Sequence, residues 1–108
     1  MTTLPGNHLV TVYEAHNETL GETYLGTTTL LSRDLAAAFL RYPPKKIRGR
    51  WHLEHGVSLR CIAYAIPLDS GEAFIRKYAR SRRDRARTIT DTATIIGSGR
   101  LAISAGAL

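Results

Sequence analysis

Two tyrosines, Tyr13 and Tyr24, stand eleven positions apart on either side of a polar break that contains Gly21. A phenol can hydrogen-bond a phosphate or move a proton, but its ordinary pKa near 10 means that it needs a metal ion or a basic neighbour to act as a base at neutral pH. The simpler interpretation is a β-hairpin with two aromatic strand residues. The spacing therefore predicts either a structural hairpin or a catalytic or nucleic-acid-binding site built on one.

Two clusters of basic residues form a second feature that could bind a ligand. Residues 41–50 contain five cations and no acid, namely Arg41, Lys45, Lys46, Arg48 and Arg50. Residues 76–87 contain seven cations and one acid, and helical spacing brings Arg76, Arg80 and Arg83 to one face, with Lys77 beside them. The formal net charge of the 108-residue chain is +6.

Lysines and arginines placed against phosphates release counterions, which favours sequence-independent binding of nucleic acid. These charges indicate nucleic acid, DNA above all, as the partner rather than an anionic membrane. A solvated helix face, or an acidic protein partner, is the alternative. The expected binding residues are Arg41, Lys45, Lys46, Arg48, Arg50, Arg76, Lys77, Arg80 and Arg83.

Three further motifs favour structural roles. His52 and His55 could share a metal on a helix, but their surroundings indicate an extended, solvated loop with the rings on opposite faces. Gly21 and Gly26 are spaced as in a phosphate-binding loop, but Thr27 stands where that loop has a lysine. The single cysteine, Cys61, lies in an apolar run and is expected to be a small buried hydrophobe. No metal site is predicted from these residues.

The elements that must position these residues form a short series. Alternation predicts strands over residues 8–15 and 23–27, joined as a hairpin. A helix capped by Thr28 or Thr29 follows and ends before Pro43. Residues 57–66 are mostly apolar and indicate a central strand that is buried on much of both faces.

A second helix, capped by Asp69 or Ser70, is expected to run to residue 87. We therefore expect an α+β fold: a small single domain, β-hairpin–helix–strand–helix, with a mainly antiparallel central sheet. The expected division is residues 1–87 as the domain and residues 88–108 as a tail that forms strands or is partly disordered.

Composition points to a cytoplasmic protein. No apolar run approaches the roughly 20 residues of a membrane span, and the N-terminus has no signal-peptide pattern. One cysteine excludes an internal disulfide framework. We expect no membrane association.

The hairpin residues Thr11-Val12-Tyr13 and Tyr24-Leu25-Gly26 resemble the two half-motifs of the GIY-YIG nuclease superfamily. The order after the hairpin is also similar to that of the family: a helix, a third strand, and a helix that begins with a Glu-Ala pair, here Glu72-Ala73. The likeness covers roughly residues 8–82.

The resemblance implies site residues position by position. Tyr13 and Tyr24 match the signature tyrosines of the active face, and Gly26 matches the glycine of the second half-motif. The family's phosphate-bracing arginine corresponds to Arg33, one residue before the usual spacing. The family's metal-binding glutamate corresponds to Lys77, and an ammonium group cannot ligate Mg²⁺.

Three functions remain open at this point. The first is a GIY-YIG-like domain that binds nucleic acid without efficient cleavage, with no certain cofactor. The second is an active Mg²⁺-dependent DNA endonuclease using Tyr13, Tyr24 and Arg33, with Glu72 or Glu54 recruited for the metal. A carboxylate within reach of the tyrosines would favour it. The third is a protein-interaction module or homo-oligomer formed through the tail, whose apolar face would comprise Ile89, Ile95, Ile96, Leu101 and Ile103.

Overall fold

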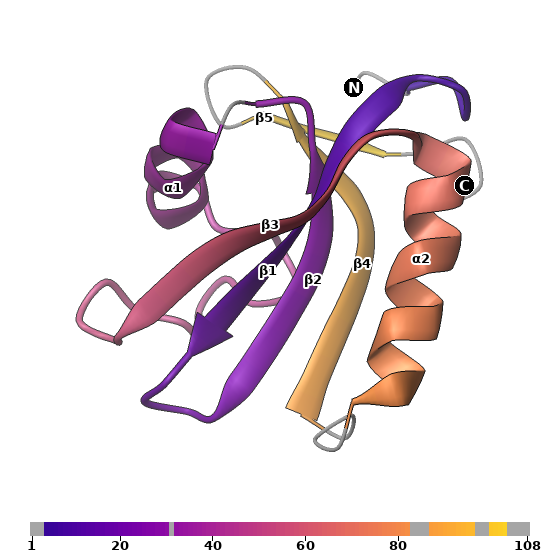
Figure 1. The fold of residues 1–108 in the computed structure, drawn as a ribbon. Coiled ribbons are helices and arrows are strands. Elements are labelled where there is room, and N and C mark those ends of the chain that lie inside the picture. Colours follow the sequence, from indigo (N-terminus) through magenta and orange to yellow (C-terminus); the bar gives the residue numbers. More distant parts are fainter. Residues whose placement is uncertain (1–3, 31, 83–86, 97–99, 104–108) are drawn as a thin grey trace.

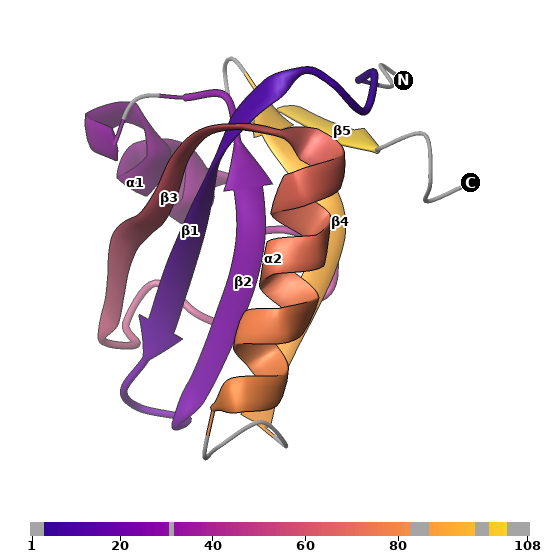
Figure 2. The same ribbon diagram turned by 45° about the vertical axis from the view of Figure 1, so that its right-hand side comes forward.

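A five-stranded sheet in the order β3-β1-β2-β4-β5 separates the two helices of the domain. The structure, a computed structural model, describes residues 4–30, 32–82, 87–96 and 100–103. The elements are β1 (Leu9–Asn17), β2 (Glu22–Thr28), α1 (Ser32–Arg41), β3 (Val57–Pro67), α2 (Leu68–Ser81), β4 (Thr88–Ile96) and β5 (Arg100–Ile103). Helix α1 lies on one face of the sheet and α2 on the other (Figures 1 and 2). The predicted α+β class is confirmed.

The predicted hairpin is present, and its alternation decides which face each tyrosine occupies. Strands β1 and β2 are antiparallel, with Tyr13 opposite Gly26 and Ala15 opposite Tyr24. Val12 and Leu25 point to the other face and pack with Ile75 of α2. The tyrosines therefore belong to the α1 face, because side chains alternate along a strand.

Each helix buries one narrow stripe. In α1 the buried residues are Leu35 and Phe39, one helical turn apart, and both pack against the tyrosines. In α2 they are Leu68, Gly71 and Ile75, which pack on the opposite face of the sheet. The sheet thus has a separate core on each side.

Three expectations about these elements are wrong. Strand β3 is an edge strand rather than a central one, since only β1 pairs with it, and none of its residues is fully buried. Helix α2 begins at Leu68 directly after Pro67, with no side-chain cap from Asp69 or Ser70. Its last residue is Ser81, so the helix is shorter than expected.

The expected threonine cap of α1 is also wrong. Helix α1 begins at Ser32, and the Thr28 hydroxyl is used in the sheet, where it donates to the Ile95 carbonyl at 2.8 Å. The same oxygen accepts from the Leu30 backbone N–H at 3.0 Å. Thr28 therefore fastens β2 to β4.

Strand β4 makes the sheet mixed. It runs parallel to β2, and its register changes between the Leu25–Thr90 and Thr27–Thr94 pairs, so that residues 91–93 face the single residue Gly26. This irregularity is a bulge, which bends the strand. Strand β5 pairs only with Ala93–Ile96, so among the described residues the outer edge of β4 from Thr88 to Thr92 has no neighbouring strand.

A buried carboxylate fastens α2 to the sheet. Glu14 of β1 accepts from Arg60 Nε at 3.0 Å and from Tyr78 Oη at 3.1 Å, and it also pairs with Arg82. Arg60 lies on β3, while Tyr78 and Arg82 lie at the C-terminal end of α2 and just beyond it. This network therefore fixes where the basic part of α2 stands relative to the strands.

We expect Gly26→Ala to destabilise the fold by about 1–3 kcal/mol, the usual effect of overpacking a buried site. A Cβ atom there would lie 2.8 Å from Tyr13 Oη and 2.9 Å from Tyr24 Cε1. Gly71→Ala is the control, because its Cβ would meet Val10 and Thr27 at an ordinary 3.4–3.5 Å while improving helix propensity. Urea unfolding measures both variants, and equal stability of the two would contradict the close packing of Gly26.

Candidate nucleic-acid interface

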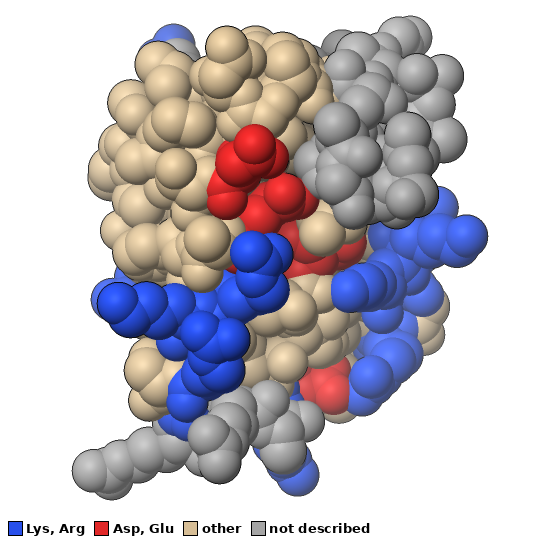
Figure 3. Space-filling view, turned by 90° about the vertical axis from the view of Figure 1, so that its right-hand side faces the viewer, with Lys and Arg blue, Asp and Glu red and all other residues tan. Residues whose placement is uncertain are grey.

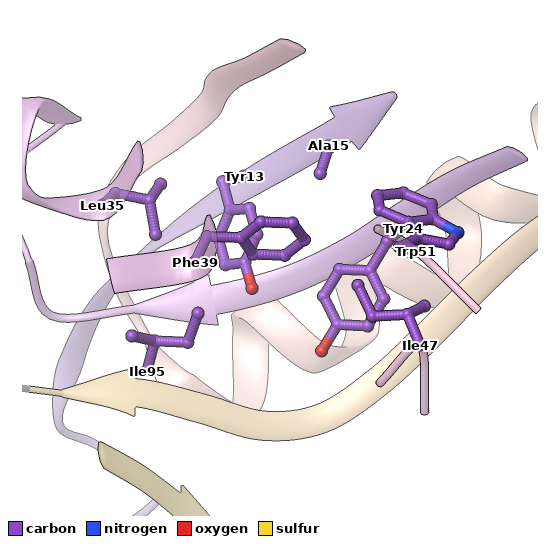
Figure 4. Packing of buried hydrophobic residues seen from close by; sticks show 8 residues of the cluster. All are labelled: Tyr13, Ala15, Tyr24, Leu35, Phe39, Ile47, Trp51 and Ile95. Carbon is purple, nitrogen blue, oxygen red and sulfur yellow. The ribbon is translucent and has the colours of Figure 1, made fainter. Parts of the chain in front are cut away.

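The two signature tyrosines lie side by side but inside the core. Their ring centroids are 6.0 Å apart, and the Phe39 ring packs on both at 5.9 and 5.8 Å. Neither residue has any exposed surface. Figure 4 shows Phe39 and Ile47 covering the pair, with both hydroxyl groups pointing from the hairpin toward β4. The sequence predicted the proximity of the two rings but not their enclosure.

The hydroxyl groups of the pair differ in their partners. Tyr24 Oη donates to Asp91 Oδ2 at 2.6 Å, while Tyr13 Oη has no hydrogen-bond partner among the described residues. Burial raises the pKa of both phenols well above the ordinary value, and for Tyr24 the neighbouring Tyr13 and the Asp91 carboxylate raise it further. A phenol with a raised pKa stays protonated at neutral pH and so does not accept a proton there.

The other residues implied by the resemblance lie away from the pair. Arg33 is exposed on α1 and is turned about 200° from the buried Leu35, since each helical residue rotates by about 100°. Lys77 is exposed on α2, which covers the opposite face of the sheet. Neither Arg33 nor Lys77 therefore shares a site with the tyrosines in this conformation.

Asp91 is a carboxylate within reach of the tyrosines, the feature that would favour the endonuclease alternative. It is within hydrogen-bond distance of Tyr24, but its second oxygen, Oδ1, accepts from the Ala93 backbone N–H at 3.1 Å. Among the described residues no three His, Cys, Asp or Glu side chains form a group able to hold a metal ion. Mg²⁺ is usually held by one or two carboxylates together with waters and substrate phosphates, and both oxygens of the carboxylate beside Tyr24 already accept hydrogen bonds.

The histidine pair has a structural role. A turn brings His52 and His55 together, with ring centroids 5.1 Å apart, so the expectation that the rings face opposite sides is wrong. His55 Nδ1 accepts from the backbone N–H of His52 at 3.2 Å and from Asn17 Nδ2 at 3.0 Å. The solvated loop that the sequence predicts is therefore held to the hairpin turn by this ring.

Much of the first basic cluster shapes its own loop. Arg48 donates twice to the Pro43 carbonyl, and Arg50 pairs with Glu22, which also accepts from the Trp51 indole at 2.9 Å. Arg41 lies over the Tyr42 ring. Lys45 and Lys46 are exposed, and Lys46 Nζ donates to the Thr90 carbonyl on the outer edge of β4.

A groove runs along that outer edge, between α2 and Lys46. It consists of two adjoining depressions, which share Arg76 and Thr90. One, of about 340 Å³, is lined by Arg76, Ala79, Arg80, Thr88 and Thr90. The other, of about 120 Å³, is lined by Lys46, Glu72, Ile75, Arg76, Thr90, Asp91 and Thr92. We call these residues together the edge groove.

The edge groove brings the two basic clusters together. Lys46 comes from the first cluster, whereas Arg76 and Arg80 come from the second. Figure 3 shows lysine and arginine side chains gathered on both sides of this face, with acidic side chains between them. Lysine, arginine and threonine side chains, all of which line this groove together with Glu72 and Asp91, are common contacts of phosphate groups.

Several predicted binding residues lie outside this groove, and several groove residues were not predicted. Arg41, Lys45, Arg48, Arg50 and Lys77 do not line it, and Arg83 lies outside the described residues. The threonines Thr88, Thr90 and Thr92, and Asp91, were not singled out. The alternating threonines of the segment TITDT could have indicated this surface, because alternation places all three on one side of a strand.

Comparison with known proteins gives no match to any family model, curated protein or solved structure. Of the helices in the described ranges, none has the length and apolar character to cross a bilayer.

We expect the two tyrosine hydroxyl groups to have opposite effects on stability. Tyr24→Phe removes a hydrogen bond to a carboxylate and should lower the free energy of unfolding by about 1.5–3 kcal/mol. Tyr13→Phe removes a buried hydroxyl without a described partner, so the free energy should stay level or rise by about 1 kcal/mol. Chemical denaturation measures both, and a larger loss in Tyr13→Phe than in Tyr24→Phe would refute the assignment.

The same pair should make the fold sensitive to alkali. Because burial raises both folded-state pKa values, the unfolded chain releases these protons first as the pH rises. The contribution of the two phenols to the free energy of unfolding is fully present below about pH 10. Above that pH the free energy of unfolding falls by up to about 1.4 kcal/mol per pH unit for each phenol. Tyr13→Phe should flatten the dependence of unfolding free energy on pH, whereas Tyr64→Phe, at an exposed position, should not. The same slope of unfolding free energy against pH in the wild type, Tyr13→Phe and Tyr64→Phe would contradict the burial of the pair.

Proposed function

We propose that this chain is a GIY-YIG-like domain that binds nucleic acid, without efficient cleavage, along the edge groove. The observation that carries the proposal is the convergence of Lys46 and Arg76, thirty positions apart in sequence, on the two sides of one groove. Arg80 extends the basic wall along α2. Such a surface favours binding through phosphates, which does not depend on sequence.

Three features support binding without cleavage. The signature phenols are enclosed and their pKa values are raised. The residue at the place of the family's metal-binding glutamate is Lys77, on the far face of the sheet from the phenols. Asp91, the carboxylate beside Tyr24, already accepts hydrogen bonds at both of its oxygens.

The interaction-module alternative has less support. Ile95 is fully buried in the core around the tyrosines, and Ile89 and Ile96 pack against the cores of this same chain. These apolar side chains of the tail are therefore used within the domain. The side chains of Leu101 and Ile103 lie outside the described part of the structure.

We expect Lys46→Ala and Arg76→Ala each to weaken binding of labelled duplex DNA at low salt by about fivefold. Each should also reduce the slope of log affinity against log salt by about 0.9, because one phosphate contact is lost. Lys45→Ala and Lys77→Ala are matched controls, since each removes the same charge from the neighbouring exposed position outside the groove. Fluorescence anisotropy over a salt series measures all four.

Equal losses of affinity in all four variants would show that DNA is attracted by the net charge of the protein rather than by the groove. If the wild type does not bind DNA, the proposal is wrong. A parallel incubation of DNA with Mg²⁺ tests cleavage. Cleavage that disappears in Tyr24→Phe and in Asp91→Asn would favour the endonuclease alternative instead.

A further inference from the structure

The chemistry of the edge groove indicates which part of a nucleic acid it holds. Its lining consists of cations, carboxylates, threonines and aliphatic side chains, and none of the described residues that line it is aromatic. Proteins that hold single-stranded bases usually stack them on aromatic rings. The exposed aromatic residues, Tyr42, Tyr64 and Phe74, do not line the groove.

The floor of the groove suits a sugar–phosphate chain. Thr88, Thr90 and Thr92 occupy alternate positions of β4, and all three line the groove. Threonine hydroxyl groups, like lysine and arginine, are common donors to phosphate oxygens. Lys46 has three donor hydrogens, so it can keep its bond to the Thr90 carbonyl and still contact a phosphate.

The acidic residues make the two depressions of the groove differ in charge. Glu72 and Asp91 both line the smaller depression, next to Lys46, whereas the charged residues that line the larger depression in the described part of the chain are Arg76 and Arg80. An anion is therefore held most strongly between Arg76 and Arg80, and it meets repulsion toward Asp91. The repulsion directs a phosphate away from Tyr24, whose hydroxyl group donates a hydrogen bond to Asp91.

We infer that the edge groove takes one phosphodiester backbone and leaves the bases outside. Binding then depends on neither the identity nor the presence of bases. This inference rests on the proposed function, because it describes the ligand of the same groove. Positions of the phosphates along β4, rather than hydrogen bonds to base edges, set the affinity.

The test compares three single-stranded oligonucleotides of equal length: one of mixed sequence, one of thymidines, and one made wholly of abasic sites. The inference expects affinities within about twofold of one another and a salt slope near −0.7 per phosphate contacted. Lys46→Ala and Arg76→Ala should weaken binding of the abasic strand by the same factor as binding of the others. Lys45→Ala, with thermal melting of every variant, controls for charge and folding.

The outcomes separate the two proposals. If the strands that carry bases bind and the abasic strand binds more than tenfold more weakly, bases are needed and the inference fails, while the proposed function stands. If the abasic strand binds but its affinity is unchanged in Lys46→Ala and Arg76→Ala, the backbone is held elsewhere and the inference also fails. If no oligonucleotide or duplex binds, the proposed function itself is overturned.

Discussion

The pairing of β4 with β2 determines both the interior and the candidate surface of this protein. Hydrogen bonds from Tyr24 to Asp91, between Thr27 and Thr94, and from Thr28 to the Ile95 carbonyl join the two strands through side chains, at 2.6–2.8 Å. Each joins residues 67 positions apart in the sequence. Without β4 the tyrosine hydroxyl groups would lack the neighbouring strand toward which they point (Figure 4).

The same pairing creates the edge groove. Because β4 lies beyond β2, its outer edge faces solvent wherever β5 does not cover it, and α2 flanks that edge. Tyr24 pairs with Ile89, so Asp91, two residues further along β4, lies on the same face and reaches the Tyr24 hydroxyl while also lining the groove. One aspartate thus lies at the boundary between a closed phenolic core and a basic surface. We propose that these two regions differ in function: the tyrosines stabilise the fold, and the cations of the groove bind nucleic acid.

Local pattern explains which parts of the molecule the sequence could predict. The hairpin follows from alternating residues and a Gly-containing turn, and the burial of Phe39 follows from its helical spacing. The edge position of β3 could not be predicted from its apolar run, because it depends on β4 joining the other side of the hairpin. The cap of α2 was misplaced, since Pro67 begins the helix without a side-chain hydrogen bond.

In the candidate site too, some features could be predicted from the sequence and others depend on the fold. The cationic clusters are visible in composition, but their meeting at one groove depends on the fold of residues 42–56 and on the Glu14 network that holds α2. Asp91 could not be singled out, because it lies in a segment of threonines and its partner Tyr24 is distant in sequence. Parallel pairing at long sequence separation leaves no local signal.

The most direct measurement of the central claim is the change in backbone amide chemical shifts when an oligonucleotide is titrated into the labelled protein. The account predicts changes centred on Thr88–Thr92 and on residues 76–80 of α2, with the ring signals of Tyr13 and Tyr24 unmoved. Changes centred on the two tyrosines and on Phe39, with the edge of β4 unaffected, would contradict it.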